Sequence, residues 1–573
     1  MFPSFLKLLG NLVFTPISLI VTLGRLFVPR SDSLCHLPGH HGVMGNLRSL
    51  FDMLRFNTLD FLLQLKEKYG TDDRSPIAFR FLGRPAVFIS DPEHIYQVFN
   101  DREHFSLSSP EFLLSSFRRE LPDNLITVSE HEWLPMRIRT NYMLNGLPLK
   151  RIVKLMRETM EQRTLPEWRE YARKGESFDI GKSVFVYSSI VACRFILGVS
   201  QDEIPDTIHD QLSRMFNHVR KRTLSPIVIP SWIPTSSNRS YVRDTTDIKN
   251  YILQYLDRAK TTHTLAGSII RARTQRNYDV TDDQWDQMTT YIQRSIDSPT
   301  ATPDEINRIL RQKYEKIKQE GEDKLSQIHY VVTELRKAIT NQYKLKESVE
   351  EDEVECELGS ILCQGGTIDV PRAVNEIRGM LIGASETTIL LMQWILIHIS
   401  ENLEIQDKIY ESIKDEKSDV PTYDPTRHKY LYGVLREGLR LGPPAFVFIR
   451  YAVKDVYMNK GEFFIPKDTT VVGSQYITHR LKDVWENETK FDPDRWNKPA
   501  QRGSFFPFTG GPRMCPGQNF AINEAFIAIA TLFKHFKFRR DDNRKVGYNV
   551  GLTLRPDTSI RIVLEPRDSP PKT

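Results

Sequence analysis

The feature that most constrains this chain is a short run near its C-terminal end, Phe508-Thr-Gly-Gly-Pro-Arg-Met-Cys-Pro-Gly517. Phe508, Arg513 and Cys515 stand at fixed offsets between glycines, and a long amphipathic segment, 518–538, follows. The run therefore predicts a loop that presents the Cys515 thiol at the N-terminus of a helix. Backbone N–H groups and the helix dipole favour an anionic sulfur there. A buried structural cysteine beside a turn is the alternative interpretation.

At every fixed position the spacing resembles the haem-binding signature of the cytochrome P450 family, Phe-x-x-Gly-x-Arg-x-Cys-x-Gly. The resemblance implies that Cys515 is the axial ligand of the haem iron. It also implies that Arg513 pairs with a haem propionate and that Phe508 packs near the sulfur. Thiolate ligation of haem iron favours O–O cleavage. The strict spacing favours haem binding over a structural cysteine.

A second motif, Glu437-Gly-Leu-Arg440, lies in a helical pattern from about 430 to 441. Residues three apart share a helix face and can pair, although such a pair alone is usually a surface salt bridge of little value. The segment Phe491-Asp-Pro-Asp-Arg495 follows downstream. In the family, the Glu and Arg of the helix meet a second Arg in a buried triad. The resemblance therefore implies a structural triad of Glu437, Arg440 and Arg495.

The segment Gly383-Ala-Ser-Glu386-Thr387-Thr388 interrupts an apolar helical run, 373–399. Ser, Thr and Gly disfavour helix interiors, and a local rule broken inside a consistent element indicates function. A helix kink packed against a neighbour is the alternative. The segment resembles the family's small-small-x-acid-Thr motif, with Ala384 where glycine is commonest. The resemblance implies catalytic roles: Thr387 supplies the hydroxyl for proton delivery during oxygen activation, and Glu386 connects that path to bulk solvent.

A third motif, Trp133-Leu-Pro-Met-Arg137, places an indole and a guanidinium on one helix face. In the family this pair donates to the haem propionates, and Arg450 matches a further propionate-binding position. Two buried propionates need several cationic or N–H donors, which Trp133, Arg137, Arg450 and Arg513 would supply. Each of these residues taken alone would be interpreted as a surface or packing residue.

Shorter patterns predict the surrounding elements. A helix ends at Tyr69-Gly70, residues 77–89 alternate like a β-hairpin, and a helix starts at Asp91-Pro92. Residues 466–476 read as a strand, and the loop between two helices over the substrate cavity falls at 232–239.

Length and composition agree with one large domain. A chain of 573 residues suggests several domains by length alone, but motifs from Trp133 to Cys515 must converge on one cofactor. The expected fold class is mainly α with a small β portion, the cytochrome P450 fold, with haem b between the distal and proximal helices. Five cysteines without framework spacing indicate a reducing compartment without disulfides. The net charge of +5 suits an acidic redox partner or anionic lipid and does not argue for nucleic acid.

The N-terminal segment predicts a membrane anchor. Seventeen uncharged residues lie between Lys7 and Arg25, at the short end of what a bilayer core needs. A cleaved signal peptide is the alternative, but no small-x-small site follows. Arg25 and Arg30 favour a cytosolic main domain, although Lys7 tempers that orientation. We expect a single-pass anchor at 1–29 in the endoplasmic reticulum membrane, a Pro/Gly hinge at 30–47, a catalytic domain at 48–566 and a polar tail at 567–573.

One region, 265–363, is longer than the corresponding part of the family. Residues 304–343 have helical periodicity, with Ile306, Leu310 and Tyr314 on one face, and an acidic run, 347–357, follows. A solvated insertion, partly helical and partly disordered, is the favoured interpretation. A docking element for a partner or a membrane is the alternative.

These features together predict a membrane-anchored haem-thiolate monooxygenase that inserts one oxygen atom of O2 into an apolar organic or lipid-like substrate. No Gly-x-Gly-x-x-Gly fingerprint follows a strand. Electrons must therefore come from a separate protein. The resemblance implies an NADPH-dependent diflavin reductase, with cytochrome b5 as a further donor. A haem-thiolate isomerase or dehydratase acting on peroxides is the alternative, against which Glu386-Thr387 argues. A non-catalytic haem-binding or scaffold protein would leave the triad and the proton path unexplained.

The resemblance also implies which segments contact substrate: 105–125, 381–388, 443–448 and 550–553. Residues 445–448 would make the pocket apolar. The run 511–521 resembles the fatty-acid and alkane hydroxylase branch, and similar runs occur in enzymes of fungal secondary metabolism. Residues around haem are generic, so they do not identify the substrate.

Overall fold

The structure is a computed structural model that describes most of the chain between residues 34 and 567. The described residues are 34–55, 57–81, 84–107, 118, 120–122, 124–128, 133, 136–137, 140–141, 144, 147–205, 207–224, 233–259, 282–296, 301–319, 335, 337–340, 342–343, 370–400, 402–424, 426–459, 461–542 and 544–567. The expected anchor at 1–29, the acidic run at 347–357, Cys356 and Cys363 lie outside them.

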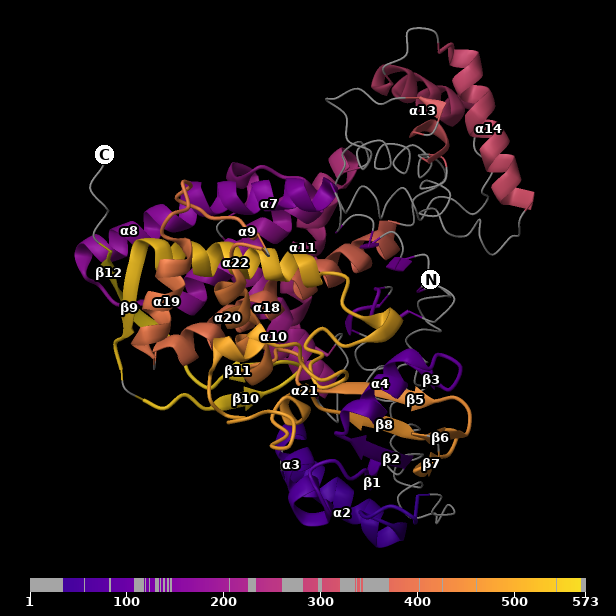
Figure 1. The fold of residues 1–573 in the computed structure, drawn as a ribbon, viewed down its shortest axis with the longest axis vertical. Helices are drawn as coiled ribbons and strands as arrows, with labels where there is room; N and C mark the ends of the chain where they lie inside the picture. Colours follow the sequence, from indigo (N-terminus) through magenta and orange to yellow (C-terminus); the bar gives the residue numbers. More distant parts are fainter. Residues whose placement is uncertain are drawn as a thin grey trace.

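Helices form most of the described chain (Figure 1). They are α2 Gly42–Arg55, α3 Thr58–Tyr69, α4 Pro92–Asn100, α7 Leu147–Thr159, α8 Leu165–Lys174, α9 Ile180–Leu197, α10 Ile208–Leu224, α11 Ser236–Ala259, α13 Asp282–Ser295, α14 Pro303–Gln319, α18 Val370–Ser400, α19 Leu403–Ile413, α20 Lys429–Leu441, α21 Gln475–Thr478 and α22 Gln518–His535.

The strands are short and fall into four small sheets. They are β1 Ile77–Phe81, β2 Arg84–Ile89, β3 Phe105–Ser106, β4 Phe178–Asp179, β5 Phe448–Ala452, β6 Val456–Met458, β7 Phe463–Ile465, β8 Thr470–Gly473, β9 Phe536–Arg540, β10 Tyr548–Val550, β11 Leu554–Pro556 and β12 Arg561–Pro566. The largest sheet has the order β1-β2-β8-β5-β3, a second has the order β4-β12-β9, and β10-β11 and β6-β7 are hairpins. The mainly α fold class with a small β portion is confirmed.

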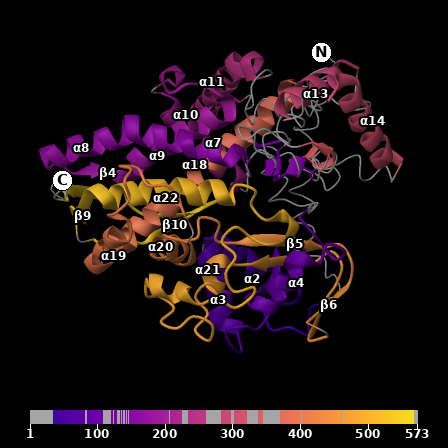
Figure 2. The same ribbon diagram turned by 45° about the horizontal axis from the view of Figure 1, so that its top comes forward.

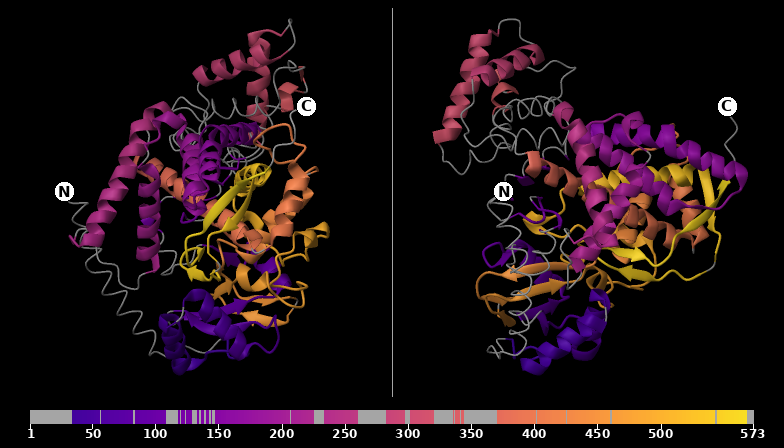
Figure 3. Two further views of the ribbon diagram at one scale, coloured as in Figure 1. Left: turned by 90° about the vertical axis from the view of Figure 1, so that its left-hand side faces the viewer. Right: turned by 180° about the vertical axis from the view of Figure 1, so that it is seen from behind.

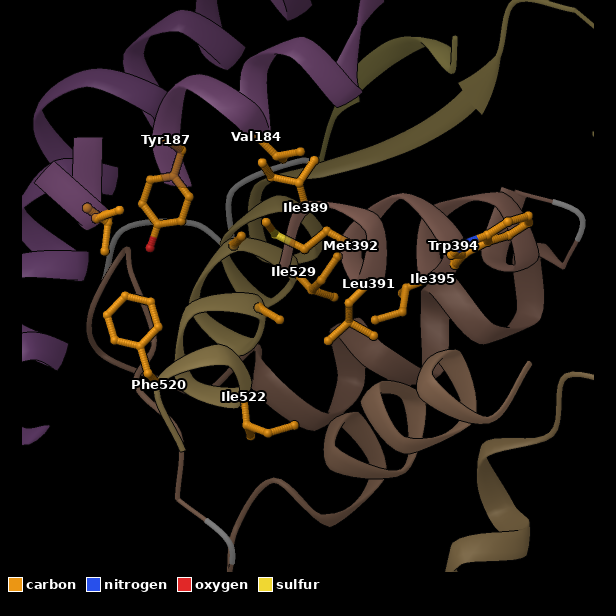
Figure 4. Packing of buried hydrophobic residues seen from close by; sticks show 14 of the residues in the cluster. Val184, Tyr187, Ile389, Leu391, Met392, Trp394, Ile395, Phe520, Ile522 and Ile529 are labelled. Atoms are coloured by element: carbon orange, nitrogen blue, oxygen red, sulfur yellow. The ribbon is translucent and has the colours of Figure 1, made fainter. Parts of the chain in front are cut away.

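The helices and the main sheet occupy different parts of the molecule (Figure 2). Helices α7 to α11, α18 and α22 gather on one side, while α2, α3, α4 and the sheet that contains β1, β2, β8 and β5 form the other. The main hydrophobic core extends through both. Its centre lies where α9, α18 and α22 pack together, with Tyr187, Met392 and Ile529 among the interdigitating side chains (Figure 4).

Helix α18 is the longest element, with 31 residues, and most of its side chains are buried. It continues through Gly383–Thr388, where hydroxyl side chains donate back to carbonyls one turn earlier. Ser385 Oγ donates to the Leu381 carbonyl at 2.8 Å, and Thr387 Oγ1 donates to the Gly383 carbonyl at 3.0 Å. The polar residues therefore satisfy their hydrogen bonds within the helix.

Two helices, α9 and α18, are long and apolar enough to cross a membrane. Both are 72% buried over the apolar window and lie at the centre of the core. We therefore interpret them as core helices.

Helices α13 and α14 form a separate hydrophobic cluster with Leu335 and Ile339. Trp285 and Tyr314 meet edge to face at 5.4 Å between ring centroids in this cluster. Figure 3 shows the two helices standing away from the main body in both views. The predicted helical stretch in the insertion is thus present, with Ile306, Leu310 and Tyr314 buried on one face.

Most predicted boundaries are confirmed: α3 ends at Tyr69, β1 and β2 pair as an antiparallel hairpin, and Asp91 caps α4. Three predictions were too long. The segment 518–538 leaves the helix at Phe536, where β9 begins; the predicted strand 466–476 is limited to β8; and Asn238 and Arg239 lie in α11 rather than in a loop. Residues 42–47 of the expected hinge begin α2.

Candidate functional site

The loop before α22 folds tightly around Cys515. The Cys515 backbone N–H donates to the Phe508 carbonyl at 2.9 Å, which closes the loop. Thr509 and Gly511 both adopt positive φ, 61° and 66°. A Cβ on Gly511 would lie 2.0 Å from the Phe99 carbonyl oxygen. A glycine is therefore needed at position 511 for both its conformation and its close approach to α4.

The Cys515 thiol is partly exposed and sits three residues before the first residue of α22. Burial raises the pKa of the thiol, and the Gly517 N–H and the charge of Arg137 oppose that rise. The Gly517 N–H thus acts on the sulfur in the direction expected for a helix N-terminus, and burial outweighs it. A cationic metal centre would supply the missing stabilisation of the anion.

Two arginines and a tryptophan surround the Cys515 loop. Arg137 donates to the Met514 carbonyl, and burial lowers its pKa, while Cys515 raises that pKa and Arg513 lowers it. The Arg513 guanidinium lies 4.1 Å from the centroid of the Trp133 ring. The structure thus brings Trp133, Arg137 and Arg513 together beside the sulfur.

Arg450 approaches the same region from the sheet. It lies on β5 and is buried, with its guanidinium 5.2 Å from the Phe99 ring centroid. Phe99 in turn packs against Gly510, where a Cβ would lie 2.6 Å from the ring. Arg450 is therefore one aromatic side chain away from the Cys515 loop.

One face of α18 borders open space. Met380, Gly383, Ala384 and Thr387 are more exposed than the buried residues between them, and their spacing puts them on one face of the helix. A Cβ added to Gly383 would meet nothing within 4 Å. Since α9, α11, α20 and α22 pack around the rest of α18, this face is where the fold leaves room for another molecule.

Glu386 does not share that open face. It is buried, with its Oε1 atom 2.6 Å from Nη2 of Arg555 on β11. Burial raises the pKa of Glu386, while Arg555, Arg220 and the Thr553 hydroxyl lower it. The predicted direct path from Glu386 to bulk solvent is therefore occupied by an ion pair.

The triad expected from Glu437, Arg440 and Arg495 is assembled. Glu437 Oε1 accepts from Arg440 Nη2 at 2.8 Å and from Arg495 Nε at 2.9 Å. The side chains of Glu437 and Arg440 are both 0% exposed. A buried carboxylate between two guanidinium groups is strongly held because removing either partner leaves an uncompensated charge.

The same arginine also fastens the loop that leads to Cys515. Arg440 donates to the carbonyls of His479, Glu488 and Lys490 at 2.9, 2.6 and 3.0 Å. The indole of Trp496 donates to Glu437 Oε2 at 3.0 Å. The triad thus ties α20 to the irregular segment between α21 and the Cys515 loop, in keeping with a structural role.

These residues fit a haem. The donor set offers one thiol, a group of guanidinium and indole donors beside it, and a small-residue face of α18 with room above Gly383. A porphyrin with two propionates and an iron that takes a thiolate matches each of these features. In the part of the chain that the structure describes, no group of three His, Cys, Asp or Glu side chains is placed to hold a bare metal ion.

A family model, Cytochrome P450, matches residues 37–290 and 275–560 of this chain. The chain belongs to the cytochrome P450 family. It is 31% identical over 199 residues to a cytokinin hydroxylase of Arabidopsis thaliana, a match that covers 34% of this chain and 38% of that protein.

Two further relatives come from other kingdoms. Cytochrome P450 4c21 of Blattella germanica is 29% identical over 204 residues, 34% of this chain and 40% of that protein. Cytochrome P450 52A3-A of Candida maltosa is 29% identical over 210 residues, 33% of this chain and 40% of that protein. The matches thus span about two fifths of these relatives' own lengths.

The structure also reveals site residues that the sequence did not point to. Arg555 on β11 and Arg220 on α10 surround Glu386, together with Thr553 of the predicted segment 550–553. Glu524 is 0% exposed on α22 and lies beside the hydroxyls of Ser188 and Thr388. A signal for Glu524 was present, since it is a lone acid within an apolar helical run. No local pattern marks Arg220 or Arg555.

Proposed function

We propose that this P450 is a haem-thiolate monooxygenase that inserts one oxygen atom of O2 into an apolar organic or lipid-like substrate. The observation that carries the proposal is the meeting of Trp133, Arg137 and Arg513 around the Cys515 thiol. These residues are far apart in sequence, and their convergence on one thiol supports a shared cofactor. The open face of α18, with Thr387 on it, supports a reaction space bordered by this helix.

The proposed cofactor, haem b, supplies the binding and reduction of O2. Cys515 holds it from the α22 side, and Arg137, Arg450 and Arg513 with the Trp133 indole neutralise and bind its carboxylates. Residues 445–448 add an apolar wall for the substrate, with Phe446 and Phe448 buried.

Two residues of α18 handle protons in this proposal. Thr387 holds a proton donor at its hydroxyl, which lies on the open face of the helix. Glu386 takes up and releases a proton at its carboxylate, whose pKa burial raises. Release of its ion pair with Arg555 would precede proton exchange with solvent.

The test of the cofactor is the carbon monoxide difference spectrum of the reduced protein. The parent chain should show a thiolate-type Soret band, and Cys515→His should lose it. Cys35→Ser is the matched control, because Cys35 is an exposed free cysteine elsewhere in the fold, and it should keep the band. A thiolate-type band in Cys515→His would reject Cys515 as the ligand and with it the proposed function.

We further infer that the protein sits on the endoplasmic reticulum membrane through residues 1–29. A separate NADPH-dependent diflavin reductase would dock near Cys515 and deliver electrons. Met514, a 39% exposed apolar side chain in that loop, supports an accessible contact there. Removal of residues 1–30 should shift the protein from the membrane pellet to the supernatant after ultracentrifugation. Full retention in the pellet would contradict the anchor.

A further inference from the structure

Helix α10 has one face toward the interior and one toward solvent. Leu212, Met215, Phe216 and Val219 are buried, whereas Arg214 and Lys221 are exposed. Arg220 follows Phe216 by four residues and therefore lies on the same, inward face. A cation on the buried face of an amphipathic helix needs a partner.

The surroundings of Arg220 are the hairpin β10–β11 and the Glu386 side of α18. A Cβ on Gly551, in the hairpin loop, would lie 2.8 Å from Arg220 Cδ and 3.5 Å from its Nη1 atom. The charge of Arg220 acts on both Glu386 and Arg555. Arg220 thus sits where α10, α18 and the hairpin meet, beside the segment 550–553.

The charges at this junction do not balance. Glu386 is the acid that faces both arginines, and its Oε1 atom is already paired with Arg555 at 2.6 Å. Arg220 donates to Asn217 Oδ1 at 3.4 Å, a weak bond, and its Nε atom is buried without a hydrogen-bond partner among the described residues. Two guanidinium groups therefore share one carboxylate, and the junction carries one positive charge in excess.

Packing holds the Arg555 side chain next to Glu386. The Arg555 guanidinium lies 4.8 Å from the Phe216 ring centroid, and its Nε atom donates to the Thr553 hydroxyl at 3.3 Å. The strand that carries it is fixed by Trp394, whose indole donates to the Leu554 carbonyl at 3.1 Å. Among the described residues both arginines keep a buried N–H without a hydrogen bond, Nε in Arg220 and Nη2 in Arg555, but Arg555 has Glu386 within ion-pair distance. Arg220 is therefore the cation left to bind a further anion.

We propose that Arg220 is an anion-binding residue of the substrate pocket, which selects apolar substrates that carry a carboxylate. The proposal rests on the proposed function and adds the substrate class to it. A guanidinium presents parallel N–H donors that match a carboxylate, and an apolar chain would extend from it along the hairpin loop toward the open face of α18. A long-chain fatty acid has this chemistry.

The experiment compares a carboxylate ligand with a neutral one of equal length. Dodecanoate and dodecanol are titrated into the purified, haem-loaded full chain, and binding is read from the haem spin-state change and, independently, by equilibrium dialysis of the radiolabelled ligands. A charge-assisted hydrogen bond corresponds to roughly 10- to 100-fold in affinity. The parent should bind dodecanoate tighter than dodecanol by about that factor.

Three variants locate the effect. Arg220→Ala should lose the preference for dodecanoate while its affinity for dodecanol stays the same, and Arg220→Lys should keep part of the preference. Lys221→Ala removes the same charge from the exposed face of the same helix and should bind like the parent. Arg220→Gln, which keeps a polar side chain with a hydrogen-bond donor but removes the charge, replaces Arg220→Ala if the latter does not fold.

The outcomes separate this proposal from the proposed function. A parent that binds dodecanol with a spin-state change but shows no preference for dodecanoate overturns the anion-binding role alone. So does an unchanged preference in the folded Arg220→Ala or Arg220→Gln protein. A parent without a thiolate-type spectrum overturns the proposed function instead.

Discussion

Glu386 and Thr387 are adjacent in sequence but face different surroundings. Successive helical residues point about 100° apart, so the Thr387 hydroxyl lies on the open face of α18 while the Glu386 carboxylate lies against Arg555. The two side chains therefore cannot exchange a proton directly. A proton that passes between them needs water or a movement of Glu386 away from β11.

The first prediction concerns Thr387→Ala. The variant should bind haem and substrate like the parent, because the hydrogen bond that the Thr387 hydroxyl makes within the described residues is to a carbonyl of its own helix. Product formed per NADPH oxidised should fall, with hydrogen peroxide rising in its place. Loss of a positioned proton donor typically slows the affected step by ~10²–10⁴-fold. The measurement is product, NADPH and peroxide counted in one assay with the reductase.

Thr388→Ala is the control for this prediction. Thr388 is the next residue, is buried, and also donates to a carbonyl one turn earlier, at 3.4 Å. It should lower stability without uncoupling NADPH oxidation from product. Unchanged coupling in Thr387→Ala would remove Thr387 from the mechanism.

Sequence reasoning found the site residues that belong to short motifs and missed those that do not. Cys515, Arg513 and Glu437 were identified because neighbouring residues at fixed offsets mark them. Arg220 and Arg555 have no such neighbours, and they meet Glu386 only because the tertiary fold brings α10 and β11 to the Glu386 side of α18. Their role depends on tertiary contacts that no local pattern encodes.

At the scale of elements, Glu524 lies where α22 crosses α9 and α18. It is 0% exposed. Burial raises its pKa to about 8, and the hydroxyls of Ser188 on α9 and Thr388 on α18 oppose that rise. Glu524 is therefore uncharged at neutral pH and links three core helices through polar contacts. The Cys515 loop directly precedes α22, so the packing at this crossing also fixes how far Cys515 lies from α18.

The second prediction is that Glu524→Gln stabilises the protein at neutral and alkaline pH. The folded pKa of about 8 exceeds the ordinary value of 4.5. Between these values the unfolded chain releases a proton that the folded chain keeps, so the free energy of unfolding falls as pH rises. The neutral amide removes this pH dependence. At pH 8 it should raise the free energy of unfolding by at most on the order of 3–5 kcal/mol.

Chemical unfolding of the two proteins from pH 5 to pH 9 checks the prediction. Glu404→Gln provides the baseline, since Glu404 is exposed on α19 and pairs with Lys408 at the surface. It should leave the pH dependence unchanged. Parallel curves for the parent and Glu524→Gln would show that Glu524 is already ionised in the folded protein.

Element types were predictable where the pattern was local, and boundaries failed where pairing decides them. The helix around Glu437 was predicted within one residue of α20, because its apolar spacing is strong. The end of α22 was not, since Phe536–Phe538 continue the apolar pattern but pair with β12 in an antiparallel ladder. Backbone pairing with a strand later in the chain thus overrides the helical periodicity.

At the scale of the whole molecule, the described residues form four hydrophobic clusters that share no residue, and two of these are the main core and the core of the insertion. The main core surrounds the candidate haem site, and the smaller one lies between α13 and α14. Its buried residues include Trp285, Met288, Ile306 and Leu310. The sequence predicted helical periodicity here but favoured a solvated insertion, because the charged residues dominate its composition and the partner helix needed for burial could not be identified. The structure shows that the predicted helical part packs with α13 into a small unit with a core of its own.

The last prediction is that this unit opens without disturbing the main domain. Trp285 is the largest side chain of the small core. Its ring packs edge to face against Tyr314, and the Arg311 guanidinium lies 5.1 Å from the Trp285 ring centroid. Trp285→Ala should lower the free energy of unfolding of this unit by about 3–5 kcal/mol, which exceeds the stability that so small a core provides. Amide hydrogen exchange in 282–319 should then become fast, while α9, α18 and α22 keep their protection and the carbon monoxide spectrum is unchanged.

Trp168→Ala is the comparison, because Trp168 is fully buried in the main core and its indole donates to Ser183 at 2.9 Å. That variant should weaken protection in the main helices, and an equal loss there in Trp285→Ala would mean that both cores unfold as one unit.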